Sequence, residues 1–217
     1  MNFERARFNM VEQQVRPWDV LDFDVLDLMM DSRREEYVPP AYKALALSEA
    51  EIPLGHGATM LKPVIEGKVL QALKLGRKDQ VLEIGAGSGY FAALMAARVE
   101  WVRSIEIEPE LARFATENLK RNGVENVVVE EGDGSRGWPN KAPYDLIVVS
   151  GGLPVLPHAM LEQLKVGGRL FAFVGEAPLM SARLVTCTGK GEFRTEDLFE
   201  TLVPQLKNAP QRDSFEF

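Results

Sequence analysis

Cysteine and histidine are scarce in this sequence. One cysteine, Cys187, among 217 residues excludes an intrachain disulfide bond and any zinc site built from several cysteines. His56 and His158 are the only two histidines. His56 lies in a loop without a serine, cysteine or metal partner nearby in the sequence, so we expect it to be structural. We expect no metal site.

Long apolar runs are also missing. No run approaches the length of a membrane span, and the first residues, MNFERARFNMVEQQ, mix acids and bases without the apolar core of a signal peptide. We therefore expect a cytoplasmic protein that has no membrane partner.

The chain lacks clusters of basic residues. Its formal net charge is −7, and the lysines and arginines are scattered, whereas phosphate contact depends on clustered cations. We expect no nucleic-acid partner. Hydrophobic residues make up 46% of the chain, which is enough to fill the core of one large domain spanning residues 1–217. The sequence leaves the oligomeric state open.

Residues 79–108 form the segment around which the chain is organised. Residues 81–84 predict a β-strand, which stops at the glycine-rich turn GAGSG, and residues 90–97 have a helical pattern. Glycines permit positive φ angles and let a ligand lie against bare main chain, while the first N–H groups of the helix face it. A second predicted strand, residues 101–105, ends in Glu106, where a doubly wound sheet places an acid against a ribose.

A glycine turn of this kind has three interpretations: a nicotinamide site, a purely structural turn, or a site for a cationic nucleoside. Tyr90 stands where the dinucleotide fingerprint requires its third glycine, so the spacing is G-x-G-x-G. Glu83, two residues before the first glycine, would repel a pyrophosphate but suits a cationic ligand. The combination E-x-G-x-G-x-G, followed by an acid at the end of the second strand, resembles the cofactor site of class I S-adenosylmethionine-dependent methyltransferases.

Strands and helices alternate from about residue 66 onward, and this core is preceded by an N-terminal part of a different kind. We predict helices over 64–75, 109–121 and 157–164, strands over 127–129, 144–150 and 169–174, and a closing hairpin over 184–188 and 193–203. This order predicts an α/β fold with a doubly wound, mostly parallel seven-stranded sheet and an antiparallel final strand. Residues 1–65 read as an N-terminal helical cover with an acceptor-side loop, and 66–217 as the cofactor-binding core.

The carboxyl ends of parallel strands meet at one edge of a sheet, where ligands bind in open α/β folds. Asp133 comes just after the third strand, beside Gly134. We therefore expect the glycine turn, Glu106 and Asp133 to share one pocket, although a residue beside glycine can also be a plain turn residue.

Six motifs resemble protein-L-isoaspartate O-methyltransferases, in order and with sensible gaps, from about residue 10 to about residue 204. They are MVEQQVR (10–16), REEYVP (34–39), IPLGHG (52–57), VLEIG (81–85), GDGS (132–135) and LKVGGRL (164–170). This family methylates the free carboxylate of isoaspartyl residues in damaged proteins. The resemblance implies a Rossmann-like methyltransferase fold and S-adenosyl-L-methionine as cofactor. It also implies a cofactor site that includes Glu83, Ile84, Gly85, Ala86, Gly87, Gly89, Glu106, Ile107, Asp133 and Gly134.

The acceptor side departs from the family at one informative position. Where the family has Thr-Ile-Ser before a proline, with the serine hydroxyl in the active site, this chain has Thr59-Met60-Leu61. The family's later Val-Pro-Leu is Val203-Pro204-Gln205 here. Leu61 has no hydroxyl, which makes the acceptor side more apolar.

Three functions are therefore open: a carboxyl methyltransferase acting on isoaspartyl proteins or peptides, a methyltransferase with a more apolar small-molecule acceptor, and a non-catalytic cofactor-binding interaction module. We assign no catalytic acid or base, because a carboxylate acceptor with a pKa near 4 is already ionised at neutral pH.

Overall fold

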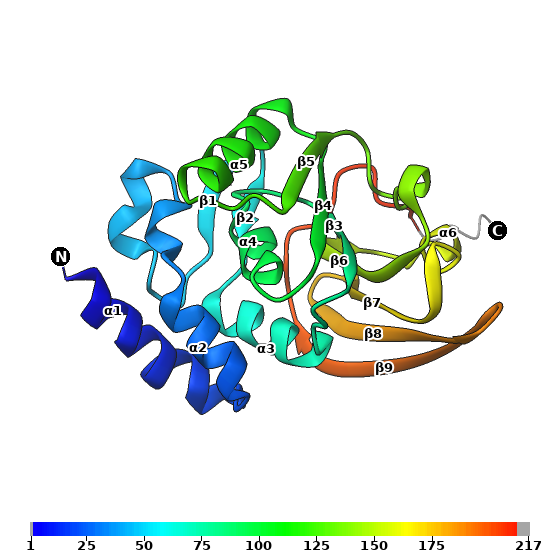
Figure 1. Cartoon of the computed structure of the whole chain (residues 1–217), viewed down its shortest axis with the longest axis horizontal. Helices are drawn as coiled ribbons and strands as arrows, with labels where there is room; N and C mark the ends of the chain where they lie inside the picture. Colours follow the sequence, from blue (N-terminus) through cyan, green and yellow to red (C-terminus); the bar gives the residue numbers. More distant parts are fainter. Residues whose placement is uncertain (1, 212–217) are drawn as a thin grey trace.

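The computed structural model describes residues 2–211 and consists of a twisted seven-stranded sheet flanked by helices (Figure 1). The strand order is β5-β4-β3-β6-β7-β8-β9. The bounds are β3 (Gln80–Ile84), β4 (Trp101–Glu106), β5 (Val127–Glu131), β6 (Tyr144–Leu153), β7 (Leu164–Glu176), β8 (Leu179–Gly189) and β9 (Glu192–Thr201).

The first five strands of this order pair in parallel, while β8 is antiparallel to both β7 and β9. The predicted fold class is thus confirmed, with the antiparallel pairing in the closing hairpin. That hairpin is longer than predicted, since β8 begins at Leu179 rather than near residue 184.

Helices cover both faces of the sheet. They are α3 (Pro63–Leu73), α4 (Tyr90–Ala96), α5 (Pro109–Arg121) and the short α6 (His158–Leu161), with a 3-10 turn at Pro139–Lys141. Proline at the first position starts α5, and the helix buries one apolar stripe that includes Leu111, Ala115 and Leu119. The sequence predicted α6 to be longer. The helix ends at Leu161, and β7 begins at Leu164. Between them, the Gln163 carbonyl accepts a hydrogen bond from the Tyr144 backbone N–H at 2.8 Å, which ties the start of β7 to β6.

The N-terminal helical segments are α1 (Phe3–Asn9), the π-helical turn η1 (Met10–Val15), η2 (Arg16–Trp18), α2 (Phe23–Asp31), η3 (Arg34–Glu36) and η4 (Pro40–Leu45). Of these, η1 and α2 pack on α3. The contact is close because Gly67 of α3 has no side chain. A Cβ atom there would lie within 3.0 to 3.3 Å of Val15, Val20 and Met29.

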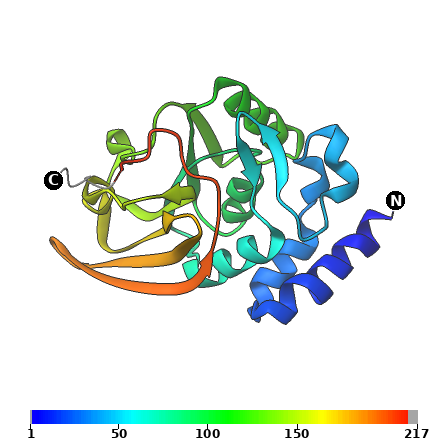
Figure 2. The same ribbon diagram turned by 180° about the vertical axis from the view of Figure 1, so that it is seen from behind.

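A two-stranded hairpin replaces the loop that the sequence predicted before α3. Strand β1 (Ile52–Gly55) pairs with β2 (Ala58–Met60), and His56 and Gly57 form the tip with φ angles of 53° and 78°. Positive φ at both central residues is the geometry of the type I′ turn, whose twist matches that of paired strands. The hairpin lies beside the chain segment that follows β9, as seen from behind (Figure 2).

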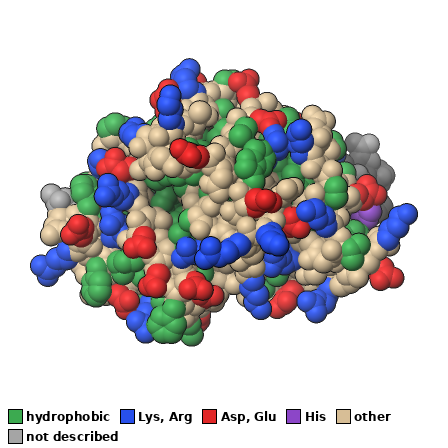
Figure 3. Space-filling model, in the orientation of Figure 1, with side chains coloured by type: hydrophobic (Ala, Val, Ile, Leu, Met, Phe, Trp, Pro, Cys, Tyr) green, Lys and Arg blue, Asp and Glu red, His purple; other side chains and the backbone are tan. Residues whose placement is uncertain are grey.

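Charged side chains of both signs are interspersed over the face of the molecule shown in Figure 3. Among residues 2–211, no helix combines the length and the apolarity needed to cross a membrane.

Arg34 is the largest fully buried side chain, and it makes three polar contacts. Its guanidinium pairs with the buried Glu66 of α3, and it donates to the carbonyls of Ala46 at 2.8 Å and Leu61 at 2.7 Å. Burial raises the pKa of Glu66 to about 7, although the Arg34 charge opposes that shift. One guanidinium thus joins the N-terminal cover, α3 and the end of the β1–β2 hairpin.

We predict that Arg34→Met destabilises the protein by about 3–5 kcal/mol at pH 8, because it leaves the Glu66 carboxylate buried without a partner. At pH 5 the loss should be smaller, since Glu66 is then protonated and only two carbonyls lose a donor. Urea denaturation at both pH values measures the difference. As a control, Arg34→Met/Glu66→Met should recover the pH-dependent part, and an equal loss at both pH values in the single variant would contradict the prediction.

Candidate active site

The glycine turn after β3 exposes main chain at the carboxyl edge of the sheet. Gly85 and Gly87 have φ angles of 94° and 53°, in the left-handed region that glycine adopts without strain. Both residues line a cavity of about 270 Å³ and, on the other side of the turn, a smaller one of about 40 Å³. Their bare backbone lets a ligand approach the turn closely.

Glu106 ends β4 beside this turn. Its carboxylate accepts hydrogen bonds from the backbone N–H groups of Gly87 at 2.9 Å and Glu108 at 3.0 Å. Ile107 follows it, and both residues line the larger cavity. The end of β4 therefore presents a fixed acceptor and an apolar side chain to one space.

Glu83 of β3 is fully buried next to the smaller cavity. It accepts hydrogen bonds from the hydroxyls of Ser104 and, at 3.2 Å, Ser150. Burial raises the pKa of Glu83 to about 8, a shift that the two serine hydrogen bonds only partly offset. A cation placed near this carboxyl group would favour its ionised form.

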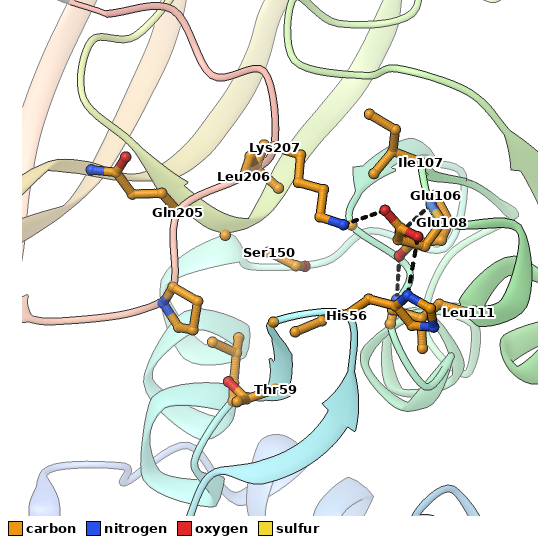
Figure 4. A pocket seen from close by; sticks show the side chains of 17 residues that line it. His56, Thr59, Glu106, Ile107, Glu108, Leu111, Ser150, Gln205, Leu206 and Lys207 are labelled. Carbon is orange, nitrogen blue, oxygen red and sulfur yellow. Dashed lines mark hydrogen bonds and ion pairs between the residues drawn. The ribbon is translucent and has the colours of Figure 1, made fainter.

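The acceptor-side residues lie across the cavity from the glycine turn. Thr59 and Leu61 line both cavities, Met60 lines the smaller one, and Pro204 lines the larger one (Figure 4). The Thr59 hydroxyl is buried and has no hydrogen-bond partner among the described residues. Leu61 is only 8% exposed, and its carbonyl is the one held by Arg34.

Other predicted site residues lie outside the lining of both cavities. Val203 is buried in the core, and Ile84 packs beneath Gly134. Gly89 serves the contact between α4 and α5, because a Cβ atom there would come within 3.1 Å of the Ala115 carbonyl. The sequence grouped these residues with the ligand, and in the structure they lie outside the lining of both cavities.

Asp133 is also absent from both linings, although it lies at the same edge of the sheet. Its carboxylate accepts hydrogen bonds from the Ser135 backbone at 2.9 Å and from the Asn208 side chain at 3.0 Å. Burial acts to raise the pKa of Asp133, but these hydrogen bonds outweigh it and the pKa is lowered. The acceptor that the sequence assigned to a ligand is therefore engaged by the chain itself.

Sequence reasoning missed an ionic cluster at the mouth of the larger cavity. Figure 4 shows His56 and Lys207 converging on Glu108 from opposite sides. His56 lies 3.3 Å from Glu108 and 2.9 Å from Glu110, and Lys207 forms an ion pair with Glu108. The hydrogen bond from Lys207 lowers the pKa of Glu108. The tip of the β1–β2 hairpin and the C-terminal segment are thus held to the start of α5.

Ser150, in the carboxyl-terminal half of β6, was also missed, although its position after the apolar run 146–149 could have indicated it. It lines both cavities and donates to Glu83.

The polar groups around the glycine turn fit a nucleoside ligand that carries an ammonium group. Glu83 and Glu106 are hydrogen-bond acceptors, and the buried Thr59 hydroxyl has an unused donor. No group of three or more His, Cys, Asp or Glu side chains within residues 2–211 is arranged to hold a metal ion.

Comparisons with known proteins give one consistent description. The family model "Protein-L-isoaspartate(D-aspartate) O-methyltransferase (PCMT)" matches residues 7–207. A protein-L-isoaspartate O-methyltransferase 2 of Pelobacter propionicus is 40% identical over 198 residues, covering 91% of this chain and 88% of that protein. A protein-L-isoaspartate O-methyltransferase 1 of Rhodopseudomonas palustris is 43% identical over 208 residues, covering 94% and 84%.

Two solved structures share the fold. A protein-L-isoaspartate O-methyltransferase aligns with a TM-score of 0.80 at 24% identity, over 94% of this chain and 66% of that chain. A Plasmodium falciparum structure of the same description, in complex with S-adenosyl-L-homocysteine, aligns with a TM-score of 0.79 at 19% identity, over 95% and 99%.

We predict that Glu83→Gln removes part of the pH dependence of stability. The folded-state pKa of Glu83 is about 8, against an ordinary value of 4.5, so the folded state holds a proton that the unfolded state releases. Its contribution is fully present below pH 4.5 and is lost as the pH rises through about 8, with a slope of about −1.4 kcal/mol per pH unit.

Urea denaturation between pH 5 and pH 8 should therefore give a flatter stability profile for Glu83→Gln than for the wild type. Glu117→Gln, at an exposed position of α5, should keep the wild-type profile. Parallel profiles for all three proteins would mean that Glu83 is ionised in the folded state.

Proposed function

The chain belongs to the protein-L-isoaspartate(D-aspartate) O-methyltransferase family, and we propose that the acceptor of its methyl transfer is the free carboxylate of isoaspartyl residues in proteins or peptides. It is an S-adenosylmethionine-dependent methyltransferase. The observation that carries the proposal is the family match over residues 7–207, which includes both the glycine turn and the acceptor-side hairpin. We also propose that residues 1–217 act as one methyltransferase domain.

We propose that the cofactor occupies the larger cavity at the glycine turn, where Glu106 accepts from its ribose hydroxyls, and that its ammonium group reaches the smaller cavity, which Glu83 lines. Ile107 would pack on the base, and Asp133 would accept from it. When bound, S-adenosylmethionine supplies a methyl group on a sulfonium, which is already a reactive electrophile. The protein therefore has to bind, orient and exclude water.

No general base is needed for a carboxylate acceptor, which is ionised at neutral pH. In our proposal the acceptor lies between Thr59, Leu61 and Pro204, and the rate comes from in-line positioning and from enclosing two oppositely charged reactants away from water. The Thr59 hydroxyl is the buried donor free to orient the acceptor.

A more apolar acceptor is a second candidate, because much of the lining of the larger cavity is apolar. This part of the lining consists of Ala58, Leu61, Ile107, Leu111, Pro204 and Leu206. An uncharged acceptor would avoid the desolvation cost that a carboxylate meets beside Leu61.

Binding of the demethylated product, S-adenosylhomocysteine, tests the cofactor assignment. Isothermal titration calorimetry should show saturable binding to the wild type. We expect Glu106→Ala to weaken it by about 2- to 12-fold for each hydrogen bond lost, and Asp133→Ala to weaken it by less. Glu117→Ala is the matched control on the surface of α5. A folded wild-type protein that gives no binding signal would rule out the assignment.

Leu61→Ser tests the acceptor. A hydroxyl that donates to a carboxylate in the transition state contributes about 1.5–3 kcal/mol, or about 10- to 150-fold in rate. We expect weak methylation of an isoaspartyl peptide by the wild type, none of its aspartyl twin, and a gain of this order in kcat/KM on Leu61→Ser. Transfer of labelled methyl measures it, at a temperature where both proteins are folded.

Leu75→Ser, a part-buried position outside both cavities, is the control and should bring no gain. Strong wild-type activity that Leu61→Ser leaves unchanged would show that Thr59 or a backbone N–H already orients the carboxylate. Transfer only to uncharged small molecules in a parallel panel would favour the second candidate.

A further inference from the structure

The segment Pro204–Asn208, which we call the C-terminal strap, separates Asp133 from the cavity that Glu106 lines. Pro204, Gln205, Leu206 and Lys207 all belong to that lining, whereas Asp133 and Gly134 do not. The strap follows β9 and crosses the carboxyl edge of the sheet (Figure 2). Its path accounts for the exclusion of Asp133 from the predicted common pocket.

The first half of the strap is anchored to the end of β6. The Gly152 N–H donates to the Pro204 carbonyl at 2.8 Å, and the Leu206 N–H donates to the Gly152 carbonyl at 2.9 Å. The Leu206 side chain packs against Gly151, where a Cβ atom would lie 2.7 Å away, and also reaches Gly85. These contacts fix the strap as far as Leu206.

Among the described residues, the strap beyond Leu206 makes two side-chain contacts before it reaches Ala209, which is buried in the core and whose N–H donates to the Leu206 carbonyl at 3.4 Å. Lys207 pairs with Glu108, and the Asn208 side-chain amide donates to Asp133 at 3.0 Å. Asn208 has a φ of 57°, the left-handed conformation that asparagine tolerates better than most residues. Both residues are exposed, so they can leave Glu108 and Asp133 while Leu206 and Ala209 stay packed on either side of them.

The side-chain amide of Asn208 donates to Asp133 in the way that the amine of an adenine base would. A side-chain amide presents an NH₂ group, as the exocyclic amine of adenine does. If Glu106 accepts from the ribose and Glu83 faces the ammonium group, the amine is the remaining donor of the cofactor, and Asp133 is an acceptor at the same edge of the sheet that already binds an NH₂ group.

We propose that Asn208 is an internal competitor for the adenine amine, and that the strap beyond Leu206 swings away when the cofactor binds. This inference rests on the proposed function, because it takes Asp133 as part of the cofactor site. When the Asn208 side chain returns to Asp133, it lowers the affinity of the site for the cofactor and for the demethylated product alike. Release of the product is therefore faster.

Calorimetry with S-adenosylhomocysteine tests the competition. Asn208→Ala should tighten binding by about 2- to 12-fold, the range expected for one hydrogen bond that no longer has to be broken. Gln211→Ala is the matched control. Within residues 2–211, its side-chain amide donates to the Ala209 carbonyl at 3.1 Å and not to Asp133, so this variant should bind with the affinity of the wild type.

A double-mutant cycle supplies the specific readout. In the Asp133→Ala background, Asn208→Ala should bring no gain, because the acceptor for which the two amides compete is gone. For the same reason Asp133→Ala should cost more affinity in the Asn208→Ala background than in the wild type, where one hydrogen bond is exchanged for another.

Hydrogen exchange gives a second measurement, which does not depend on affinity. The backbone amides of Lys207, Asn208 and Ala209 should exchange faster when S-adenosylhomocysteine is bound, while the Leu206 amide stays protected by its hydrogen bond to the Gly152 carbonyl. Weaker or unchanged binding by Asn208→Ala, or slower exchange of the amides of residues 207–209 in the complex, would overturn the proposal. Absence of wild-type binding would instead refute the proposed function.

Discussion

The buried guanidinium of Arg34 is the interaction on which the site depends most. A charge that is fully removed from water must be matched by an opposite charge and by acceptors for its remaining N–H groups. Arg34 meets this requirement with Ala46 after η4, Leu61 at the end of the β1–β2 hairpin and Glu66 of α3. Arg34 therefore fixes the position of Leu61 at the cavity through the backbone carbonyl of that residue.

Much of the fold could be predicted because its signals are local. Apolar runs interrupted by glycines predict the strand, the glycine turn and the helix around Gly85. Pro109 and Gly123 mark the two ends of α5. Alternating strands and helices imply a mostly parallel sheet, and parallel order in turn brings Gly85 and Glu106 together. Gly85 and Glu106 are close together because of the sheet topology, and no single motif predicts it.

The remaining parts of the site depend on contacts that no local pattern encodes. Lys207 and Glu108 are 99 positions apart, and His56 and Glu110 are 54 apart. Such pairs form because tertiary packing brings two loops to one point. The β1–β2 hairpin was read as a loop, since two strands of four and three residues are too short to show an alternating pattern.

The carboxylate of Glu108 connects two walls of the larger cavity. One wall is the β1–β2 hairpin, held through His56, and the other is the strap, held through Lys207, yet both attach to this single side chain. Two loops that lie about 150 positions apart in the chain are therefore thermodynamically linked through one charge. Because the Lys207–Glu108 ion pair lies near the surface, dissolved salt screens it, and the strap is the wall of the cavity whose attachment weakens as ionic strength rises.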